Sequence, residues 1–212
     1  KMYNSDSYWG AQWSLNTLWH LVYPEVTEEF INAMLKMYDD GGLIPRGPSG
    51  GNYTYVMTGA TTTPFIVSAY LKGIRGFDMA KAYEGMRKDH FPGGMMSKAG
   101  YEHKTFKGGG IEEYISMGYV PHPLHPIKYG FHQDGAAQTL EYAYQDFAMA
   151  QIAKVLNKQS DYDLFMKRAG NKASFDQANT NLDTDRIIDG RSFNNAIQAP
   201  PRIKKVHHLG NR

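Results

Sequence analysis

GFHQDGAAQTLEYAYQDFAMAQIAKVLNK, residues 130–158, is the stretch that decides the fold of this chain. It opens as a polar, glycine-containing loop and continues into the longest helical pattern of the sequence. On a helical wheel of about 100° per residue, with Leu140 at zero, one sector from about −20° to +160° holds most of the large apolar residues. The positions of this sector are Leu140, Tyr144, Phe147, Ala148, Gln151, Ile152, Val155 and Leu156. The pattern predicts a helix with one buried stripe, and it places Asp146 on the opposite side, in water.

Glu141 falls near the middle of the predicted buried stripe, between Ala148 and Ile152 on the wheel. A carboxylate on a buried face costs free energy unless it is hydrogen-bonded or paired. Two interpretations remain open at this point. Glu141 lines a polar cavity between helices, or it caps a neighbouring helix or pairs with an arginine, as structural networks of buried carboxylates do.

Composition bounds the remaining possibilities. The 212 residues are 42% apolar and carry a net charge of +2, with 23 basic and 21 acidic side chains. This is enough apolar material for one sizeable core, and the charge balance does not suggest a nucleic-acid or membrane partner. The first ten residues have no apolar signal-peptide core and no initiator Met, so we expect a part of a longer chain. With no cysteine in the sequence, disulfides and thiolate metal sites are excluded.

Helical periodicity recurs along the chain, and no segment predicts a strand with comparable strength. We expect helices over residues 14–23, 26–40, 61–72, 79–88, 111–117 and 161–168, besides the helix that carries Glu141. We expect Pro24 to end the first of them. Tight Gly or Pro turns join these helices in pairs, whereas every second connection is long and rich in Gly, Tyr and polar residues. This arrangement predicts an all-α fold, a partial (α/α)6 toroid of paired helices with long loops at one end.

The sequence changes character near residue 169. We therefore predict a partial toroid over residues 1–168 and an atypical tail over residues 169–212. The tail is rich in Asn, Asp and Gln and ends in a basic cluster from Arg202 to Arg212. A poorly packed terminus is the favoured interpretation, and an anion-binding tail is the alternative.

The long loops carry carboxylates and amides next to aromatic residues. These candidates for substrate binding are Asp6, Asn52, Tyr101 and Asp134, with Glu141 on the adjoining helix. Carboxylates and amides bind sugar hydroxyls, and aromatic rings stack on the apolar faces of pyranoses. The histidines at 122, 125 and 132 lie in a proline-held extended segment without an acidic partner, so we predict no transition-metal site there. Dinucleotide-binding, phosphate-loop and nucleophile-elbow motifs do not occur in the sequence.

Several blocks, in order, resemble glycoside hydrolase family 92. They are NTLWHLVYPEV (16–26), MYDDGGLIPRGPSGGNYTYVMTG (37–59), KGIRGFDMAKAYEGMRKDH (72–90), PGGMMSKAGYEH (92–103), GYVP (118–121) and QTLEYAYQDFAMAQIAKVL (138–156). The family consists of calcium-dependent, inverting, exo-acting α-mannosidases. The resemblance therefore implies an (α/α)6 toroidal catalytic domain that removes terminal mannose, α-1,2-linked by expectation, from glycans such as N-glycans or mannans. It also implies a secreted or periplasmic location.

Two departures from the family pattern matter. The block that usually reads Trp-Asp-Thr-(Phe/Tyr)-Arg is SDSYW here, so Asp6 matches the family's sugar-binding Asp while Trp9 replaces the Arg. The family's general acid lies in a Glu-Gly/Ala-Asn-x-x-Gln block and its base in a Gly-Asn-Asp/Glu-Asp block, and neither occurs in these 212 residues.

The catalytic residues are therefore unknown, and we expect this chain to be truncated before them and to be inactive alone. Calcium is expected for the full-length enzyme, but no residue of this chain supports a metal site. A non-catalytic glycan-binding or structural remnant is the alternative. A half-toroid would expose apolar helix faces, so we also expect self-association.

Overall fold

The structure is a computed structural model, and it describes residues 3, 8, 10–47, 52–98, 108–121 and 135–170. Within these ranges it contains two short 3₁₀ helices and seven α-helices. They are η1 (Ala11–Trp13), α1 (Leu15–Val22), α2 (Pro24–Gly41), α3 (Thr62–Leu71), α4 (Met79–Asp89), η2 (Met95–Ser97), α5 (Ile111–Met117), α6 (Gly135–Val155) and α7 (Gln159–Ala169). The helices predicted from periodicity are all present, with ends shifted by no more than a few residues. None of the described helices is long and apolar enough to cross a bilayer.

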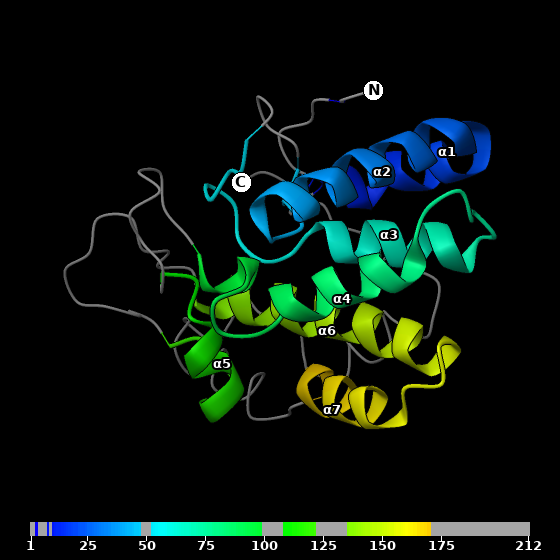
Figure 1. Cartoon of the computed structure of the whole chain (residues 1–212). Helices are drawn as coiled ribbons and strands as arrows, with labels where there is room; N and C mark the ends of the chain where they lie inside the picture. The colour runs from blue at the N-terminus through cyan, green and yellow to red at the C-terminus, as the bar shows by residue number, and fades with distance from the viewer. Residues whose placement is uncertain are drawn as a thin grey trace, which may run out of the picture.

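The helices are arranged in pairs, with short turns at one end and long connections at the other (Figure 1). Tyr23 alone separates α1 from α2, seven residues separate α3 from α4, and three separate α6 from α7. The long connections lead from α2 to α3, from α4 to α5 and from α5 to α6. The fold is all-α over the described residues and forms part of an α/α toroid, which confirms the predicted fold class.

Local chemistry explains most helix ends. Asp78 caps the N-terminus of α4, because its carboxylate accepts a hydrogen bond of 3.0 Å from the Lys81 backbone N–H. Gly42 ends α2 in the left-handed region, at φ 78°. As predicted, the first helix ends just before Pro24, but the second helix begins earlier than predicted, with Pro24 as its first residue instead of Val26. The fixed φ and missing N–H of Pro24 suit that position, where no intrahelical bond is lost.

The main core lies between α2, α3, α4, α6 and α7, and aromatic rings fill its N-terminal part. The ring centroids of Tyr8 and Phe65 lie 4.4 Å apart, and those of Trp19 and Phe30 lie 5.2 Å apart, both pairs stacked. A second, smaller cluster lies at the end with the long connections. Its buried members are Ala60, Met96, Ile111, Tyr114, Val120 and Tyr142. This second cluster gives the loop end a packed floor.

The buried side of α6 differs from the predicted stripe. Tyr144 and Val155 are exposed, whereas Asp146 is fully buried, so the prediction of a solvated Asp146 was wrong. On the same wheel, the buried residues of α6 span about 80°, at Ala148, to about 300°, at Ala143. The reason is that α6 packs against both α3 and α7, so neighbours on two sides decide which positions are buried. Glu141, at about 100°, lies between the buried Ala148 and Ile152, near one edge of this arc, and is only partly buried.

The buried Asp146 carboxylate has two partners, His90 and Arg168. One carboxylate oxygen lies 2.7 Å from His90 Nδ1, and the other accepts a 2.7 Å hydrogen bond from Arg168 Nε. Arg168 Nη1 also donates to the His90 carbonyl at 3.1 Å. This network ties α6 to α7 and to the residue that follows α4. A buried carboxylate is tolerated here because each of its oxygens has a partner.

Candidate functional site

A polar cluster lies on the N-terminal half of α6, at the end of the molecule that carries the long connections. It consists of Gln12 from η1, with Glu141 and Gln145 from α6, and we call it the amide–carboxylate cluster. Glu141 Oε1 accepts a hydrogen bond of 3.4 Å from Gln12 Nε2, and Glu141 Oε2 accepts one of 3.1 Å from Gln145 Nε2. Two amide donors thus account for the carboxylate at the edge of the buried face. The cluster joins the N-terminal 3₁₀ turn to α6 across 129 residues of sequence.

Gln145 connects this cluster to the loop that precedes α3. Its Oε1 accepts a hydrogen bond of 2.8 Å from the Ala60 backbone N–H. Gly59 lies directly against the same amide, and a Cβ added there would come within 2.4 Å of Gln145 Oε1. Gly59 also has a φ of 75°, which favours glycine. Position 59 therefore lets the backbone approach α6 closely, and this fixes the distal end of the loop.

Asn52 lies on the same loop and is exposed. Its side-chain Oδ1 accepts a 2.8 Å hydrogen bond from the backbone N–H of Tyr53. The Tyr53 hydroxyl in turn contacts the Met37 and Leu43 carbonyls, both at 2.9 Å, and so anchors this part of the loop to the end of α2. Asn52 is thereby held next to an anchored tyrosine, at the start of the described segment 52–98.

Arg46 is a structural residue of the loop end that the sequence interpretation missed. It is fully buried, and its guanidinium donates to three backbone carbonyls: Nε to Gly59, and Nη2 to Met95 at 2.9 Å and to Lys98 at 2.6 Å. Burial lowers the pKa of Arg46 to about 10, so the side chain stays charged at neutral pH. The only signal in the sequence was an arginine between Pro45 and Gly47, where a solvated loop residue is the usual interpretation.

The Arg46 guanidinium holds three loop segments in fixed relation beneath the loop end. Asp89 lies in the same buried region and accepts a 3.4 Å hydrogen bond from the Met95 backbone N–H. Burial raises the pKa of Asp89 well above its usual range, against the opposing effects of that hydrogen bond and of the Arg46 charge. These two groups stabilise the floor of the site and have no contact with solvent, so they do not themselves meet a substrate.

A hydroxyl, an imidazole and a carboxylate follow one another in the buried interior. Thr63 Oγ1 lies 3.1 Å from His90 Nε2, and His90 Nδ1 lies 2.7 Å from Asp146. The order is that of a nucleophilic triad. All three side chains are fully buried, however, so no substrate reaches the hydroxyl. Burial lowers the pKa of His90, which favours the neutral ring despite the carboxylate beside it. We therefore assign this series a structural role.

The structure describes two of the five predicted substrate-binding residues, Glu141 and Asn52, and it places both at the loop end. Asp6, Tyr101 and Asp134 lie outside the described residues, as do the histidines at 122, 125 and 132. Of the tail predicted over residues 169–212, only Ala169 and Gly170 are described. The roles of Asp6, Tyr101 and Asp134, of these histidines and of the tail therefore stay predictions.

A calcium ion would need several oxygen ligands around one point. In the part of the chain that the structure describes, no three His, Asp or Glu side chains come together in this way. The described residues therefore offer no cluster of acidic side chains for the calcium that the family resemblance implies.

Comparison with known proteins identifies relatives of this chain. The family model described as the glycosyl hydrolase family 92 catalytic domain matches residues 1–205. An uncharacterized secreted glycosidase from Arthroderma benhamiae is 25% identical over 179 residues, which cover 83% of this chain and 21% of the relative. The matched family region extends beyond residue 168, where the predicted partial toroid ends and the atypical tail was predicted to begin.

Two solved structures from Bacteroides thetaiotaomicron are similar to this one. One is a family GH92 inverting mannosidase, with 31% identity and a TM-score of 0.67 over 80% of this chain and 21% of that protein. The other is a family GH92 α-mannosidase in complex with mannoimidazole, with 30% identity and a TM-score of 0.62 over 79% of this chain and 20% of that protein. The chain thus spans about a fifth of the length of the relatives it matches.

Proposed function

The chain belongs to glycosyl hydrolase family 92, and on this premise we propose that it forms one sector of the toroid of an exo-acting α-mannosidase. The substrate would be a terminal α-linked mannose, α-1,2-linked in the preferred case, on a secreted or extracellular glycan. The observation that carries the proposal is the agreement of family and fold. The family model matches residues 1–205, and the structure superimposes on a GH92 inverting mannosidase with a TM-score of 0.67.

In this proposal the described residues build the wall of the sugar site rather than its reacting centre. Glu141 and Asn52 supply polar groups at the loop end, and the Gln145 and Arg46 side chains hold the loops in place. Asp6, Tyr101 and Asp134 remain the further candidates for contacts with sugar hydroxyls. Such a division suits a glycosidase, because fixed polar groups orient a sugar ring before reaction.

Inverting hydrolysis needs a carboxylic acid that protonates the leaving oxygen and a carboxylate that activates water on the opposite face of the sugar. The family blocks that hold these residues do not occur among the 212 residues. We therefore assign no catalytic acid or base to this chain. The same observation favours a second candidate function, a glycan-binding or structural unit without hydrolysis.

Hydrolysis is tested by incubating the 212-residue chain with α-1,2-mannobiose and calcium and following released mannose by ¹H NMR. We expect no turnover. Hydrolysis at ordinary enzyme rates, on the order of 1 s⁻¹ or more, would overturn the assignment of acid and base to other residues.

Glycan binding is tested by titrating the chain with α-1,2-mannobiose and, separately, with a galactose disaccharide, using calorimetry or NMR. We expect weak binding that prefers mannose and that Asp6→Ala or Glu141→Gln reduces. Glu25→Gln is the control, because Glu25 is exposed on α2. No binding of either sugar, or equal binding in all variants, would favour the purely structural role and contradict the sugar-wall assignment.

A further inference from the structure

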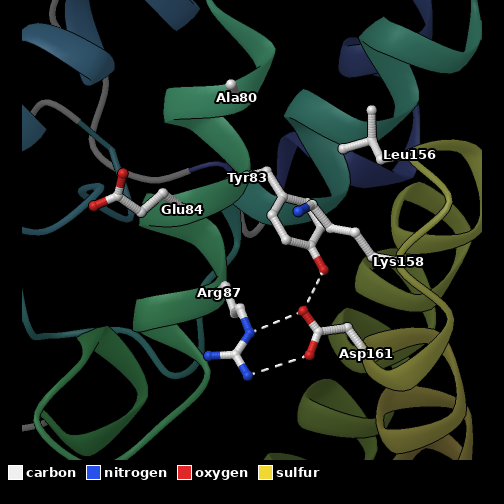
Figure 2. Close-up of a pocket in the computed structure, with 7 residues that line it drawn as sticks. All are labelled: Ala80, Tyr83, Glu84, Arg87, Leu156, Lys158 and Asp161. Atoms are coloured by element: carbon white, nitrogen blue, oxygen red, sulfur yellow. Dashed lines mark hydrogen bonds and ion pairs between the residues drawn. The ribbon is translucent and has the colours of Figure 1, made fainter.

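A pocket of about 470 Å³ lies between α4 and the turn that joins α6 to α7 (Figure 2). Figure 1 shows this turn at the end of α6 that faces away from the long connections. One side is a face of α4, formed by Ala80, Tyr83, Glu84 and Arg87. The other side is the turn between α6 and α7 and the first turn of α7, which contribute Lys158 and Asp161. The volume lies within the range of about 300–1,000 Å³ that is usual for small-molecule sites.

Both carboxylate oxygens of Asp161 are already engaged in this pocket. Asp161 accepts hydrogen bonds from the Tyr83 hydroxyl at 2.7 Å and from Arg87 Nε and Nη2 at 2.9 Å and 3.2 Å. Burial acts to raise the pKa of Asp161, but the bonds from Arg87 and Tyr83 outweigh it and keep the pKa below its usual value. Glu84 accepts a 2.9 Å hydrogen bond from the Tyr38 hydroxyl, and Figure 2 shows its side chain pointing away from the other polar groups.

The donor groups of the pocket are not fully engaged. The Lys158 ammonium lies 4.9 Å from the centroid of the Tyr83 ring and is exposed. Its charge helps to lower the pKa of Asp161, but among the described residues no hydrogen bond fixes the ammonium group. Arg87 contacts Asp161 through two of its nitrogens, and Nη1 points away from that carboxylate in Figure 2. The side chain of Arg87 is 45% exposed, so it remains partly accessible to a ligand.

Two observations argue against a neutral sugar as the ligand. Sugars bind aromatic pockets by stacking on an open ring face, but Tyr83 is only 4% exposed and Lys158 covers it. Sugar hydroxyls also need acceptors, but Asp161 already takes three hydrogen bonds from Tyr83 and Arg87, and Glu84 points away from the other polar groups in Figure 2. Two cationic donors are what remain, and guanidinium and ammonium groups are the usual partners of oxyanions.

We propose that this pocket binds a small ligand through an oxyanion group, a phosphate or a carboxylate, held between Lys158 and Arg87. Asp161 acts as a positioning residue, because it fixes the plane of the Arg87 guanidinium by two hydrogen bonds. The site is separate from the amide–carboxylate cluster. Glu141 and Leu156 are 15 positions apart on one helical axis, which corresponds to about 22 Å. Failure of the mannosidase proposal would thus leave this one intact, and the reverse also holds.

The test is an NMR titration of the intact 212-residue protein with inorganic phosphate, with acetate and with mannose, at constant ionic strength. We expect phosphate or acetate to shift the amide signals of Tyr83, Arg87 and residues 158–161 in a saturable way, and mannose to leave them unchanged. A stronger response to phosphate than to acetate identifies a phosphate ligand, and the reverse order identifies a carboxylate.

Two lysine variants make a matched pair for this test. Lys158→Met removes one cation of the pocket and should weaken binding by up to about fivefold, the upper limit for one exposed ion pair. Lys154→Met is the control, because Lys154 is exposed on the preceding turn and its ammonium lies 5.6 Å from the Tyr162 ring. It should leave the affinity unchanged.

The proposal is overturned if neither anion shifts these signals at concentrations of tens of millimolar. It is equally overturned if both variants weaken binding to the same degree, because the response would then reflect general positive charge. Thermal melting of both variants checks that the fold is retained. If Lys158→Met has lost the fold, Lys158→Gln takes its place.

Discussion

Replacing Asp146 by asparagine tests the interpretation of α6 most directly. The change keeps the shape of the side chain and removes its charge. Asp146 is fully buried, and Arg168 Nε and His90 Nδ1 each lie 2.7 Å from one of its oxygens. In Asp146→Asn the Arg168 guanidinium remains buried without an anionic partner, and the new amide group presents a donor where the carboxylate had an acceptor.

The expected loss follows from the burial of both partners. Removing one member of a buried ion pair costs about 3–5 kcal/mol. Because Arg168 stays 8% exposed and keeps its bond to the His90 carbonyl, we expect a value near the lower limit, about 3 kcal/mol. For a domain of this size, that corresponds to a decrease in Tm of roughly 6–12 °C.

Urea denaturation followed by circular dichroism at 222 nm measures this loss, and an unchanged m value confirms that the folded and unfolded states are comparable. Asp163→Asn is the matched control, since Asp163 is exposed on α7 and accepts a single bond from Gln159. It should change the stability by less than about 0.5 kcal/mol. The double variant Asp146→Asn with Arg168→Met should lose less than the sum of the single changes. A loss below about 1 kcal/mol for Asp146→Asn, or strict additivity, would refute the assignment of a buried ion pair.

Three further predictions concern other parts of the molecule. Burial, with a smaller effect of Lys72, lowers the pKa of His20 to about 4, so the unfolded state binds the extra proton as pH falls below about 6.5. The free energy of unfolding should therefore decrease, as pH falls, by up to about 1.4 kcal/mol per pH unit through this group. His20→Gln should remove this part of the pH dependence in urea titrations between pH 6.5 and 4.5. The buried Asp89 carboxyl contributes a pH dependence of opposite sign, and it does so equally in both proteins. Gly59→Ala should destabilise by about 1–3 kcal/mol more than Gly73→Ala, because both have positive φ but only Gly59 has a side chain within 3 Å of an added Cβ; equal losses in thermal melts would contradict this. Leu21 is 69% exposed on α1, so Leu21→Lys should reduce the self-association expected of this chain in light scattering, and a protein that is monomeric without the change would refute that expectation.

The sequence by itself determined the class of the fold. Helical periodicity and Gly or Pro punctuation are local signals, so helices such as Ile111–Met117 could be placed to the residue. The alternation of tight and long connections also predicted that the loops gather at one end, which the structure confirms. Local signals were also sufficient for the family resemblance, because the quoted blocks of sequence can be compared without knowing what their residues contact.

Only the tertiary structure decided which side chains of those helices are buried and what they bind. The stripe predicted for Gly130 to Lys158 was rotated, because α6 has neighbours on two sides and the wheel assumes one. Asp146 lies inside and Glu141 at the edge, each held by partners that are distant in sequence: Gln12 is 129 residues from Glu141, and Arg168 comes from another helix. Burial of a charge depends on such partners, and their approach is set by packing between helices, which no periodicity within a single helix encodes.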